Sequence, residues 1–453
     1  MKNLTVENII KAVNGEFFGD ASLLRREISS VTTDSRAVTE GCLFAAIKGE
    51  NSDGHDFIGA VLDKGALIAI GEHLPGNENF PMIIVKNTVT ALGDLAAFYR
   101  RQFNIPVLGI TGSVGKTTAK EMVSAVLSQR FRVHKTPKNL NNDLGVPLTL
   151  FGLNESHECA VIEMGISHFG EMTRLAEIVR PDMALYTTIG FAHLEFLGDF
   201  DGVLKAKTEM LEYLPENGIV FVNGDNETLR KLTCKQKICR YGVSQDCEVT
   251  AENIRLLGTE GMELDIISGA RRIPTKINSY GVHMVTAALG AAAVGLQMGL
   301  TDAEIARGIA SYVPVGSRAG IIDTGKITII DDCYNANPTS VAAALDSLSL
   351  LRGRRVCILG DMGELGTAAS KLHFDTGVHA AEKGIDLVIA CGELSANTAE
   401  GAKSAGSSSA VYFRDKEKLL NELHDLVKRG DSVLVKASHS QKFEEIVEVL
   451  KKL

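Results

Sequence analysis

A glycine-bracketed loop between an apolar segment and a helical one constrains this chain more than any other feature. Residues 105–111 form an apolar run typical of a buried strand, and Lys116 follows after Gly112 and Gly115. Such glycines let backbone N–H groups turn toward an anion, and the helix that starts behind them presents its positive end. Lys116 adds a charge, and Thr117 adds a hydroxyl suited to a phosphate-bound Mg²⁺. The segment therefore predicts a strand–loop–helix unit that binds the phosphates of ATP.

This loop is a variant of the strict P-loop pattern. Ile110 stands where that pattern has a glycine six residues before Lys116. A chance Gly-Gly-Lys turn is the alternative. We disfavour it because an apolar strand precedes the loop and a helix follows it.

Length and composition indicate a multidomain globular protein. A chain of 453 residues exceeds one ordinary hydrophobic core, so about three domains are expected. The formal net charge of −9 argues against a general binder of nucleic acid or of acidic membranes. No apolar segment typical of a signal peptide follows Lys2. The uncharged segment Met284–Thr301 is rich in Ala and Gly, which is typical of a buried helix rather than a membrane span. The cysteines form no CxxC pair, so we expect reduced thiols in a cytoplasmic protein. We also expect a monomer without membrane insertion.

The periodicity predicts an α/β fold with a small first domain and a larger central one. Residues 1–85 are expected to form the first domain, with strands near Ser30–Thr33, Cys42–Ile47, Ala66–Ile70 and Met82–Val85 and a helix near His55–Lys64. Residues 86–314 are expected to form a parallel sheet that carries the phosphate loop, with a helix at Thr90–Arg101, strands at Cys159–Glu163, Met183–Thr188 and Ile219–Val222, a β-rich appendage at 236–276 and a buried helix at 282–299.

Residues 315–453 are expected to form a second doubly wound, Rossmann-like sheet. Its strands are predicted at Ile327–Asp331, Val356–Gly360, Leu387–Cys391, Val411–Phe413 and Val433–Lys436, each followed by a helical stretch. This part has no GxGxxG motif, so any nucleotide contact there depends on other residues.

Glu163 and His193 follow two successive strands of the predicted central sheet. Because the carboxyl ends of parallel strands meet at one edge, both side chains are expected on the same rim as the phosphate loop. A carboxylate beside such a loop is a suitable second ligand for Mg²⁺, and we favour that interpretation of Glu163 over an ordinary strand-end Glu. A single histidine is more often structural, so for His193 both interpretations stay open.

Lys207 interrupts the apolar face of the helix expected over Asp199–Leu214. Val203, Ala206 and Met210 recur at helical spacing, and Lys207 falls on the same face. A lysine there either extends its ammonium to water or loses its proton, because burial disfavours the charge. A neutral amine reacts with CO₂ to give a carbamate, which is a metal ligand. The periodicity alone favours the first alternative.

The third domain offers a turn dense in acids and amides. Asp332 is predicted to accept hydrogen bonds from ribose hydroxyls, and Asn335 and Asn337 to donate to a phosphate or a peptide carboxylate. The alternative, an Asn-Pro cap before a helix at 339–350, stays open. Arg318 follows the expected hinge and is predicted to reach the γ-phosphate on closure. A second acidic strand end, Leu359–Glu364, is expected on the same rim.

Taken together, these segments resemble the Mur ligase family of bacterial cell-wall synthesis over essentially the whole chain. Thr111–Thr118 is similar to the family's ATP loop, which also lacks the first P-loop glycine. Thr33–Arg36 and Lys48–His55 carry donors that suit an anionic, hydroxyl-rich substrate, and with Phe44–Gly49 they resemble the family's UDP-sugar domain. The family's metal and carbamylated-lysine segments are similar to Glu163–Gly165, His193–Glu195 and Lys205–Glu209.

The resemblance implies a set of site residues. ATP is expected to contact Thr111, Gly112, Ser113, Gly115, Lys116, Thr117, Thr118, Arg318 and Asp332. Mg²⁺ is expected at Thr117, Glu163, His193 and carbamylated Lys207. The catalytic residues implied are Lys116, Glu163, His193 and Lys207. The substrates are expected to contact Asp34, Ser35, Arg36, Lys48, His55, Asn139, Asn142, Asn335 and Asn337.

One activity within the family fits this chain best. Asp332–Pro338, Leu359–Met362 and Asn139–Asn142 followed by Gly145–Pro147 are similar to the member that joins D-alanyl-D-alanine to UDP-N-acetylmuramoyl-tripeptide. This implies an ATP-dependent amide ligase that works through an acyl phosphate in peptidoglycan precursor synthesis. The alternatives are a sister ligase that adds a single amino acid and a nucleotide-binding relative without catalysis. Met284, where the family usually has Asn beside adenine, favours the last.

Overall fold

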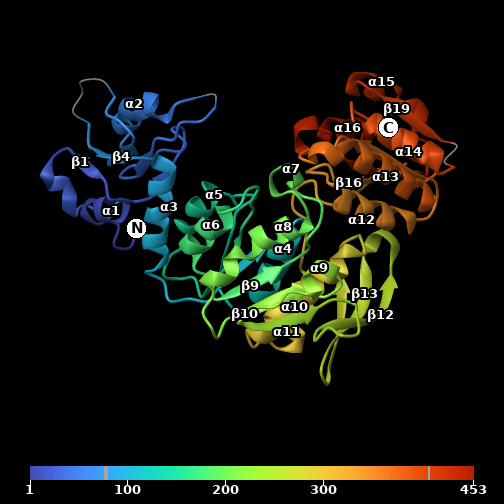
Figure 1. Ribbon diagram of the computed structural model, residues 1–453, viewed down its shortest axis with the longest axis horizontal. Helices are drawn as coiled ribbons and strands as arrows, with labels where there is room; N and C mark the ends of the chain where they lie inside the picture. The colour runs from blue at the N-terminus through green and yellow to red at the C-terminus, as the bar shows by residue number, and fades with distance from the viewer. Residues whose placement is uncertain (51, 76–79, 407–408) are drawn as a thin grey trace. The chain divides into compact units, whose positions relative to one another are not determined.

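The computed structural model describes residues 1–50, 52–75, 80–406 and 409–453 (Figure 1). Asn51, within the predicted substrate loop Lys48–His55, lies outside the described residues. Contacts group the chain into two compact units. The first comprises residues 1–110, 131–184 and 208–218, and the second comprises residues 111–130, 185–207 and 219–453. The predicted domain boundaries at 85/86 and 314/315 stay predictions.

The N-terminal part, blue in Figure 1, is built on a five-stranded sheet of order β1-β5-β4-β3-β2. The strands are β1 (Glu16–Phe18), β2 (Val31–Thr32), β3 (Leu43–Ala45), β4 (Ile68–Gly71) and β5 (Met82–Ile84). The pairs β2·β3, β3·β4 and β4·β5 are parallel, whereas β1 runs antiparallel to β5. The helical elements are α1 (Val6–Val13), η1 (Ala21–Arg25), η2 (Gly54–Phe57) and α2 (Ile58–Asp63). Phe44, Ile58, Val61 and Met82 are central members of the apolar core.

The central sheet has six strands in the order β11-β10-β9-β6-β8-β7. Its strands are β6 (Val107–Thr111), β7 (Val133–Lys135), β8 (Cys159–Glu163), β9 (Met183–Tyr186), β10 (Ile219–Asn223) and β11 (Lys237–Tyr241). All residues of β6, β8 and β9 are buried, as expected for parallel strands covered on both faces. The helical elements are α3 (Thr88–Arg100), α4 (Lys116–Leu127), α5 (Gly145–Leu150), α6 (Glu171–Val179), α7 (Leu194–Leu197), α8 (Phe200–Thr208), η3 (Glu209–Tyr213), α9 (Glu227–Arg230), α10 (His283–Gln297) and α11 (Asp302–Ala310).

The β-rich appendage is smaller than predicted. It is an antiparallel sheet of β12 (Thr250–Leu256), β13 (Met262–Ser268) and β14 (Arg271–Ile277), with the short turn η4 (Gly258–Glu260) between β12 and β13. The expected start of the appendage at 236 was wrong. Residues 237–241 form β11, which pairs in parallel with β10 and so extends the central sheet.

The C-terminal part, orange to red in Figure 1, contains the predicted doubly wound sheet. Its order is β15-β16-β20-β17-β18-β19, from β15 (Gly320–Asp323), β16 (Thr328–Asp331), β17 (Arg355–Gly360), β18 (Leu387–Cys391), β19 (Ala410–Phe413) and β20 (Ser432–Lys436). Apolar clusters cover both faces of the sheet, one centred on Ile358 and Val433 and the other on Leu345 and Leu359. The helical elements are α12 (Pro338–Ser349), η5 (Gly366–Ala368), α13 (Ala369–Glu382), α14 (Ser395–Ser404), α15 (Lys416–Leu426), η6 (His439–Gln441) and α16 (Glu444–Leu450).

Helices α13 and α14 touch through their backbones. A Cβ atom on Gly377 would lie 1.9 Å from the carbonyl oxygen of Thr398, and one on Gly401 would lie 2.0 Å from that of Phe374. Only glycine leaves room at such separations, so both positions are fixed by packing.

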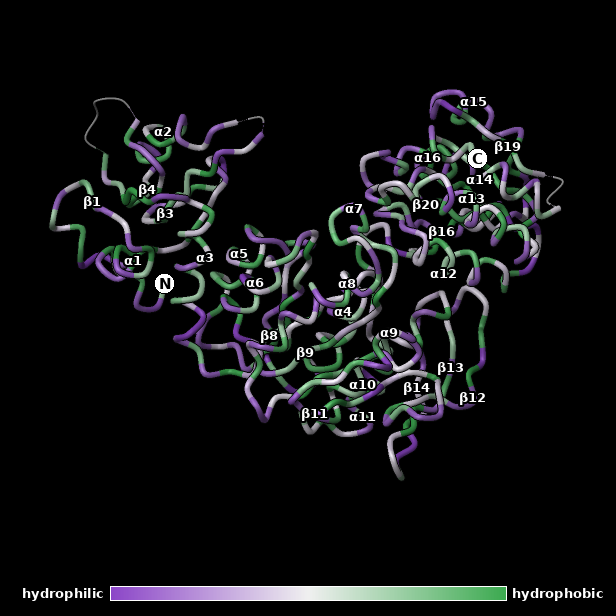
Figure 2. Tube along the Cα trace, in the orientation of Figure 1, coloured by the Kyte–Doolittle hydropathy of each residue, from purple (hydrophilic) through white to green (hydrophobic). Residues whose placement is uncertain are grey.

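Hydrophobic and hydrophilic residues alternate through all parts of the chain (Figure 2). Among the described residues, no helix is both long and apolar enough to cross a bilayer. The predicted uncharged helix is α10, and Ala288, Leu289, Ala292 and Val294 on it are buried.

Candidate active site

The phosphate loop has the predicted strand–loop–helix form. Strand β6 ends at Thr111, and α4 begins at Lys116. Gly112 and Gly115 both have positive φ, at 150° and 84°. A Cβ on Gly112 would lie 2.0 Å from Oγ1 of Thr187, so a side chain there is excluded by contact as well as by backbone conformation.

The segment after β9 holds this loop in place. Thr187 donates from Oγ1 to the carbonyl of Val114 at 2.6 Å, and the amide of Ser113 donates to the carbonyl of Thr188 at 2.6 Å. The Ser113 hydroxyl also donates to the carbonyl of Gly190 at 3.2 Å. The loop is therefore preorganised by contacts in which Ser113, a predicted ATP contact, takes part. Sequence reasoning did not identify Thr187.

The ammonium of Lys116 stays within the loop. Its Nζ donates to the carbonyl of Gly112 at 2.8 Å. Thr117 is 5% exposed at the start of α4. Thr118 forms a side-chain hydrogen bond with Tyr312. Burial raises the pKa of Tyr312 to about 12, and the bond with Thr118 offsets this rise only in part. The predicted ATP contacts from Thr111 to Thr118 thus form one continuous structure.

Glu163 ends the strand next to the one that carries the loop. In the β6–β8 register it lies opposite Ile110, one residue before Thr111. The side chain is buried, and Asn141 donates from Nδ2 to Oε1 of Glu163 at 2.8 Å. The amide of Glu163 donates to Oγ1 of Thr136 at 2.9 Å. The carboxylate is therefore held by an amide side chain at the end of β8.

Asn141 is a residue that the prediction missed. The sequence argument selected Asn139 and Asn142, but Asn142 accepts from the amide of Gly145 at 2.8 Å beside the start of α5, and Asn139 is exposed. Asn141 lies between them and is the one that contacts Glu163. A Cβ on Gly165 would lie 2.9 Å from Oδ1 of Asn141, which explains the glycine there.

Lys207 is fully buried on α8. Its exposed fraction is 0%, as are those of Val203, Ala206 and Met210 on the same face. The ammonium therefore does not extend to water, and the alternative that the periodicity favoured was wrong. The expected single helix over 199–214 is divided: α8 ends at Thr208, and a 3₁₀ segment, η3, continues to Tyr213.

His193 precedes the short helix α7 in a left-handed backbone conformation, with φ at 55°. Its side chain is 24% exposed, and its Nδ1 lies 2.6 Å from Oε2 of Glu364. Glu364 belongs to the acidic strand end that the sequence singled out, although not as a partner of His193.

Asp332 and Lys436 meet at the carboxyl ends of β16 and β20, and Arg318 lies just before β15. The Asp332 carboxylate accepts from Nζ of Lys436 at 2.6 Å and from the amide of Ala319 at 3.1 Å. The guanidinium of Arg318 lies 3.7 Å from the centre of the Tyr334 ring. The structure thus brings the two predicted nucleotide contacts of this part together, and it adds Lys436, which is buried and which prediction missed.

The two asparagines of the turn have structural partners. Asn337 is the N-cap of α12: its Oδ1 accepts from the amide of Ser340 at 2.8 Å. This is the cap that the alternative interpretation described. Asn335 accepts at Oδ1 from the amide of Ala336 at 2.9 Å, and its carbonyl accepts from Lys436 at 3.0 Å. The Oδ1 atoms of both asparagines are therefore engaged within the turn, whereas the substrate prediction requires their amide N–H donors.

In the first domain, Asp34 and Arg36 form one exposed pair. Arg36 donates from Nε to Oδ1 of Asp34 at 2.9 Å, and this contact lowers the pKa of Asp34 to about 2. The guanidinium stays 88% exposed, so it remains accessible to an anion. Ser35 is partly buried beside it, and Lys48 is exposed.

His55, a predicted substrate contact, is buried and makes its contacts within the fold. It is 4% exposed, its Nε2 accepts from the amide of Glu72 at 2.8 Å, and its Nδ1 lies 2.6 Å from Asp53. Because Nε2 is the acceptor, the ring proton sits on Nδ1 and is donated to Asp53. Both nitrogens are used within the fold, so the structure gives no support to a substrate contact by this side chain.

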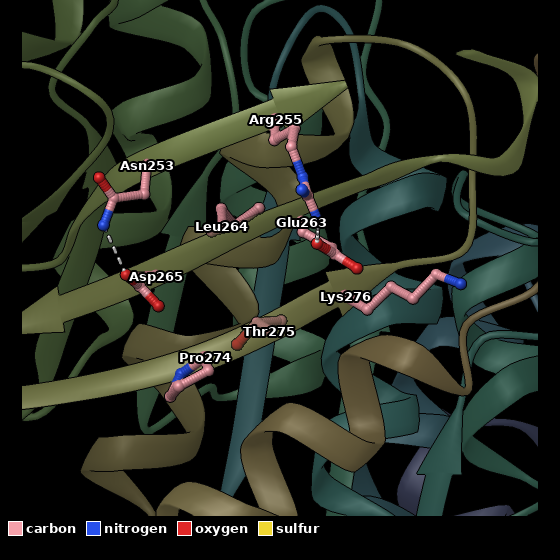
Figure 3. A pocket seen from close by; sticks show the side chains of 8 residues that line it. All are labelled: Asn253, Arg255, Glu263, Leu264, Asp265, Pro274, Thr275 and Lys276. Atoms are coloured by element: carbon pink, nitrogen blue, oxygen red, sulfur yellow. Dashed lines mark hydrogen bonds and ion pairs between the residues drawn. The ribbon is translucent and has the colours of Figure 1, made fainter. Parts of the chain in front are cut away.

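A surface depression of ≈ 540 Å³ lies elsewhere, on the appendage (Figure 3). Two pairs of its lining side chains contact each other: Arg255 forms an ion pair with Glu263, and Asn253 donates to Asp265 at 2.8 Å. None of the predicted site residues lines it.

Three family models match successive parts of the chain. Residues 27–108 match the Mur ligase family, catalytic domain; residues 110–295 match the Mur ligase middle domain; and residues 317–439 match the Mur ligase, glutamate ligase domain. A UDP-N-acetylmuramoyl-tripeptide–D-alanyl-D-alanine ligase of Escherichia coli is 36% identical over 99% of both chains. The chain belongs to the Mur ligase family. The enzyme of the same name from Bacillus subtilis is 35% identical over 98% of both chains.

Solved structures of Mur ligases have the same fold. A crystal structure of MurF from Acinetobacter baumannii superposes with a TM-score of 0.92 at 31% identity, over 99% of both chains. A MurF ligase from Thermotoga maritima in complex with ADP superposes with a TM-score of 0.84 at 28% identity, over 93% of this chain and 97% of that one. The predicted α/β fold class and the family resemblance are confirmed.

Proposed function

We propose that this Mur ligase joins D-alanyl-D-alanine to UDP-N-acetylmuramoyl-tripeptide, with conversion of ATP to ADP and phosphate. The observation that carries the proposal is the full-length similarity to ligases of that name, at 36% and 35% identity. The preorganised phosphate loop supports the use of ATP independently of that similarity.

The chemistry requires activation of a carboxylate. A carboxylate oxygen of the tripeptide attacks the γ-phosphorus of ATP, and the bond between that phosphorus and the β–γ bridging oxygen breaks. ADP departs, and the tripeptide carries an acyl phosphate. The dipeptide amine then attacks the acyl carbon, loses a proton, and expels phosphate as the amide forms. The protein contributes mainly by positioning the reactants and by neutralising charge.

Lys116 and the loop amides are proposed to hold the β- and γ-phosphates. Nζ of Lys116 donates to the carbonyl of Gly112. A phosphate oxygen carries more negative charge than that carbonyl, so we expect the ammonium to transfer to the nucleotide when it binds. Arg318 and Asp332 are proposed as further nucleotide contacts, with Asp332 held by Lys436.

Thr117, Glu163 and His193 are the proposed magnesium ligands. In the described part of the chain, no three His, Cys, Asp or Glu side chains gather into a metal site of their own. This fits Mg²⁺, which binds through one or two carboxylates and completes its coordination with substrate phosphates and water. When bound, Mg²⁺ would neutralise charge on the transferred phosphoryl group. The buried carboxylate of Glu163, fixed by Asn141, is the donor that supports this assignment best.

Lys207 is proposed to carry a carbamate. Full burial disfavours the ammonium, and a neutral amine is the form that adds CO₂. Exposure of the protein to ¹³C-bicarbonate, followed by carbon NMR, is expected to show one carbamate resonance that Lys207→Ala removes. Absence of that resonance at saturating bicarbonate would overturn the modification.

The first domain is proposed to bind the UDP-linked substrate. Asp34 holds the exposed guanidinium of Arg36, which suits the anionic diphosphate. Ser35 and Lys48 stay in the proposal, as do Asn139, Asn142, Asn335 and Asn337 for the peptide end. A cytoplasmic location is proposed as well, because ATP and UDP-linked precursors are cytoplasmic metabolites, and the monomeric state stays a prediction.

The deciding experiment measures phosphate release from ATP, the UDP-linked tripeptide and D-alanyl-D-alanine, with each omitted in turn. The tripeptide is supplied once with lysine and once with diaminopimelate at its third position. We expect phosphate release only when all three substrates are present, with at least one of these tripeptides. Release with a free amino acid in place of the dipeptide would indicate a sister ligase. No release with any combination, while nucleotide still binds, would indicate a non-catalytic relative.

A further inference from the structure

The contact between His193 and Glu364 is not explained by the fold alone. Nδ1 of His193 lies 2.6 Å from Oε2 of Glu364, although the ring N–H is not aligned as a hydrogen bond in this conformation. The two residues lie 171 positions apart in sequence, yet they are in the same compact unit.

Both residues have an unfavourable backbone conformation. His193 has φ of 55° and Glu364 has φ of 59°, in the left-handed region that non-glycine residues rarely adopt. Each such residue costs on the order of 1 kcal/mol or more and persists where the surroundings enforce it, commonly at functional sites. His193 and Glu364 both have this conformation, and their side chains contact each other. We infer that the surrounding structure enforces this contact.

The segment that carries Glu364 is held by hydrogen bonds to its backbone. The amide of Met362 donates to Nε2 of His373 at 2.9 Å, and the amide of Gly363 donates to Oγ of Ser438 at 2.9 Å. The carbonyl of Glu364 accepts from the amide of Glu195 at 3.5 Å. The carboxylate is thus presented to His193 by a fixed backbone rather than by a mobile loop.

We propose that Glu364 is a positioning residue for His193. The carboxylate accepts the Nδ1 proton, which fixes the tautomer and the orientation of the ring and leaves the Nε2 lone pair for a metal ion. Metal-binding histidines generally donate their second ring N–H to such a group, and loss of that partner costs 10- to 100-fold in metal affinity or activity, roughly. This inference rests on the proposed function, in which His193 is a metal ligand.

The first test needs no metal and no substrate. The protein is labelled with ¹⁵N-histidine, and the His193 signals are assigned by their loss in His193→Gln. Wild type is expected to show the Nδ1–H tautomer at His193, because the negative carboxylate 2.6 Å from Nδ1 favours a proton on that nitrogen even where the N–H is not aligned with it. In Glu364→Ala the signals should shift toward a mixture of tautomers, whereas Glu364→Gln, which keeps an oxygen acceptor, should retain most of the wild-type pattern.

The second test measures the Mg²⁺ concentration that gives half-maximal phosphate release. Glu364→Ala is expected to raise it about 10-fold, with an unchanged KM for D-alanyl-D-alanine, and Glu364→Gln less. Glu382→Gln, which changes an exposed glutamate at the end of α13, is the matched control and should behave as wild type. A thermal melt of each variant separates loss of folding from loss of metal affinity.

Three outcomes would overturn the proposal. They are an unchanged tautomer, an unchanged Mg²⁺ requirement or a faster rate of phosphate release in Glu364→Ala. A faster rate would mean that the contact holds an inactive conformation. A wild-type protein that shows the predicted tautomer but releases no phosphate would instead contradict the proposed function and leave the His193–Glu364 contact standing.

Discussion

At the scale of single residues, burial separates alternatives that sequence periodicity leaves open. Periodicity placed Lys207 on the apolar face of its helix. It did not determine where the ammonium lies, because a long flexible lysine side chain can extend from such a face to water. Only the packing of α8 decides that the ammonium is enclosed. Asn141 shows the same limit: three asparagines within four positions are equivalent as letters, and only the loop geometry selects the one that meets Glu163.

Lys207→Ala is expected to reduce turnover at least ~100-fold, because the proposed carbamate, a ligand for the catalytic metal, would be lost. Short-chain carboxylic acids should restore part of the rate by occupying the space left by the side chain. Phosphate release with and without added acetate measures this. Lys205→Ala, two residues away and exposed, is the control and is expected to stay near the wild-type rate. Full activity of Lys207→Ala without rescue would contradict the role.

Asn141→Ala is expected to slow turnover about 10-fold, because the buried carboxylate of Glu163 loses a hydrogen bond that fixes it. Asn141→Asp should be slower still, since a second carboxylate would face the first. Steady-state rates at saturating Mg²⁺ and substrates test this order. Equal rates for the two variants would show that the amide does not position Glu163.

At the scale of elements, the sequence predicted regular segments well and irregular ones poorly. Strand β8 lies at the predicted residues, because a short apolar run with an acid at its end has one consistent interpretation. Strand β15 was missed, since its residues are only partly buried at the sheet edge. Helix α1 was also missed, although Thr5 caps it by accepting from the amide of Asn8 at 3.2 Å.

Gly112→Ala is expected to abolish nucleotide binding without unfolding the protein. The added Cβ would meet Oγ1 of Thr187, so the loop must move away from its preorganised form. Gly258→Ala is the control: it also has a positive φ, of 66°, but no neighbouring atom lies within 4 Å of the place that its Cβ would take. ATP affinity by calorimetry should therefore be lost in the first variant and retained in the second. Wild-type affinity of Gly112→Ala would contradict the loop geometry.

Gly377→Ala is expected to destabilise the C-terminal sheet by roughly 1–3 kcal/mol, the usual cost of overpacking. The new methyl group would overlap the carbonyl of Thr398 on α14, so α13 must shift. Lys371→Ala, an exposed change on the same helix, should stay within about 0.5 kcal/mol of wild type. Chemical denaturation of both variants measures the difference, and equal midpoints would show that the helices separate without cost.

At the scale of the whole molecule, nucleotide binding is expected to stabilise the folded chain. A ligand at 100 times its Kd adds about 2.7 kcal/mol of stability if it binds only the native state. Melting curves should therefore shift upward with ATP and Mg²⁺ in wild type, and Lys116→Ala should lose the shift while it retains the ligand-free melting temperature. An unchanged shift in that variant would be fatal to the assignment of the loop.

The self-contained bond between Lys116 and the carbonyl of Gly112 has a consequence for selectivity. An incoming anion competes with that carbonyl for the position of the ammonium, so weakly held solutes such as chloride or free orthophosphate draw it away less readily than a polyphosphate does. A polyphosphate chain engages several amides at once and overcomes that competition. The resting loop thereby discriminates against the abundant small anions of a living cell before any nucleobase is examined.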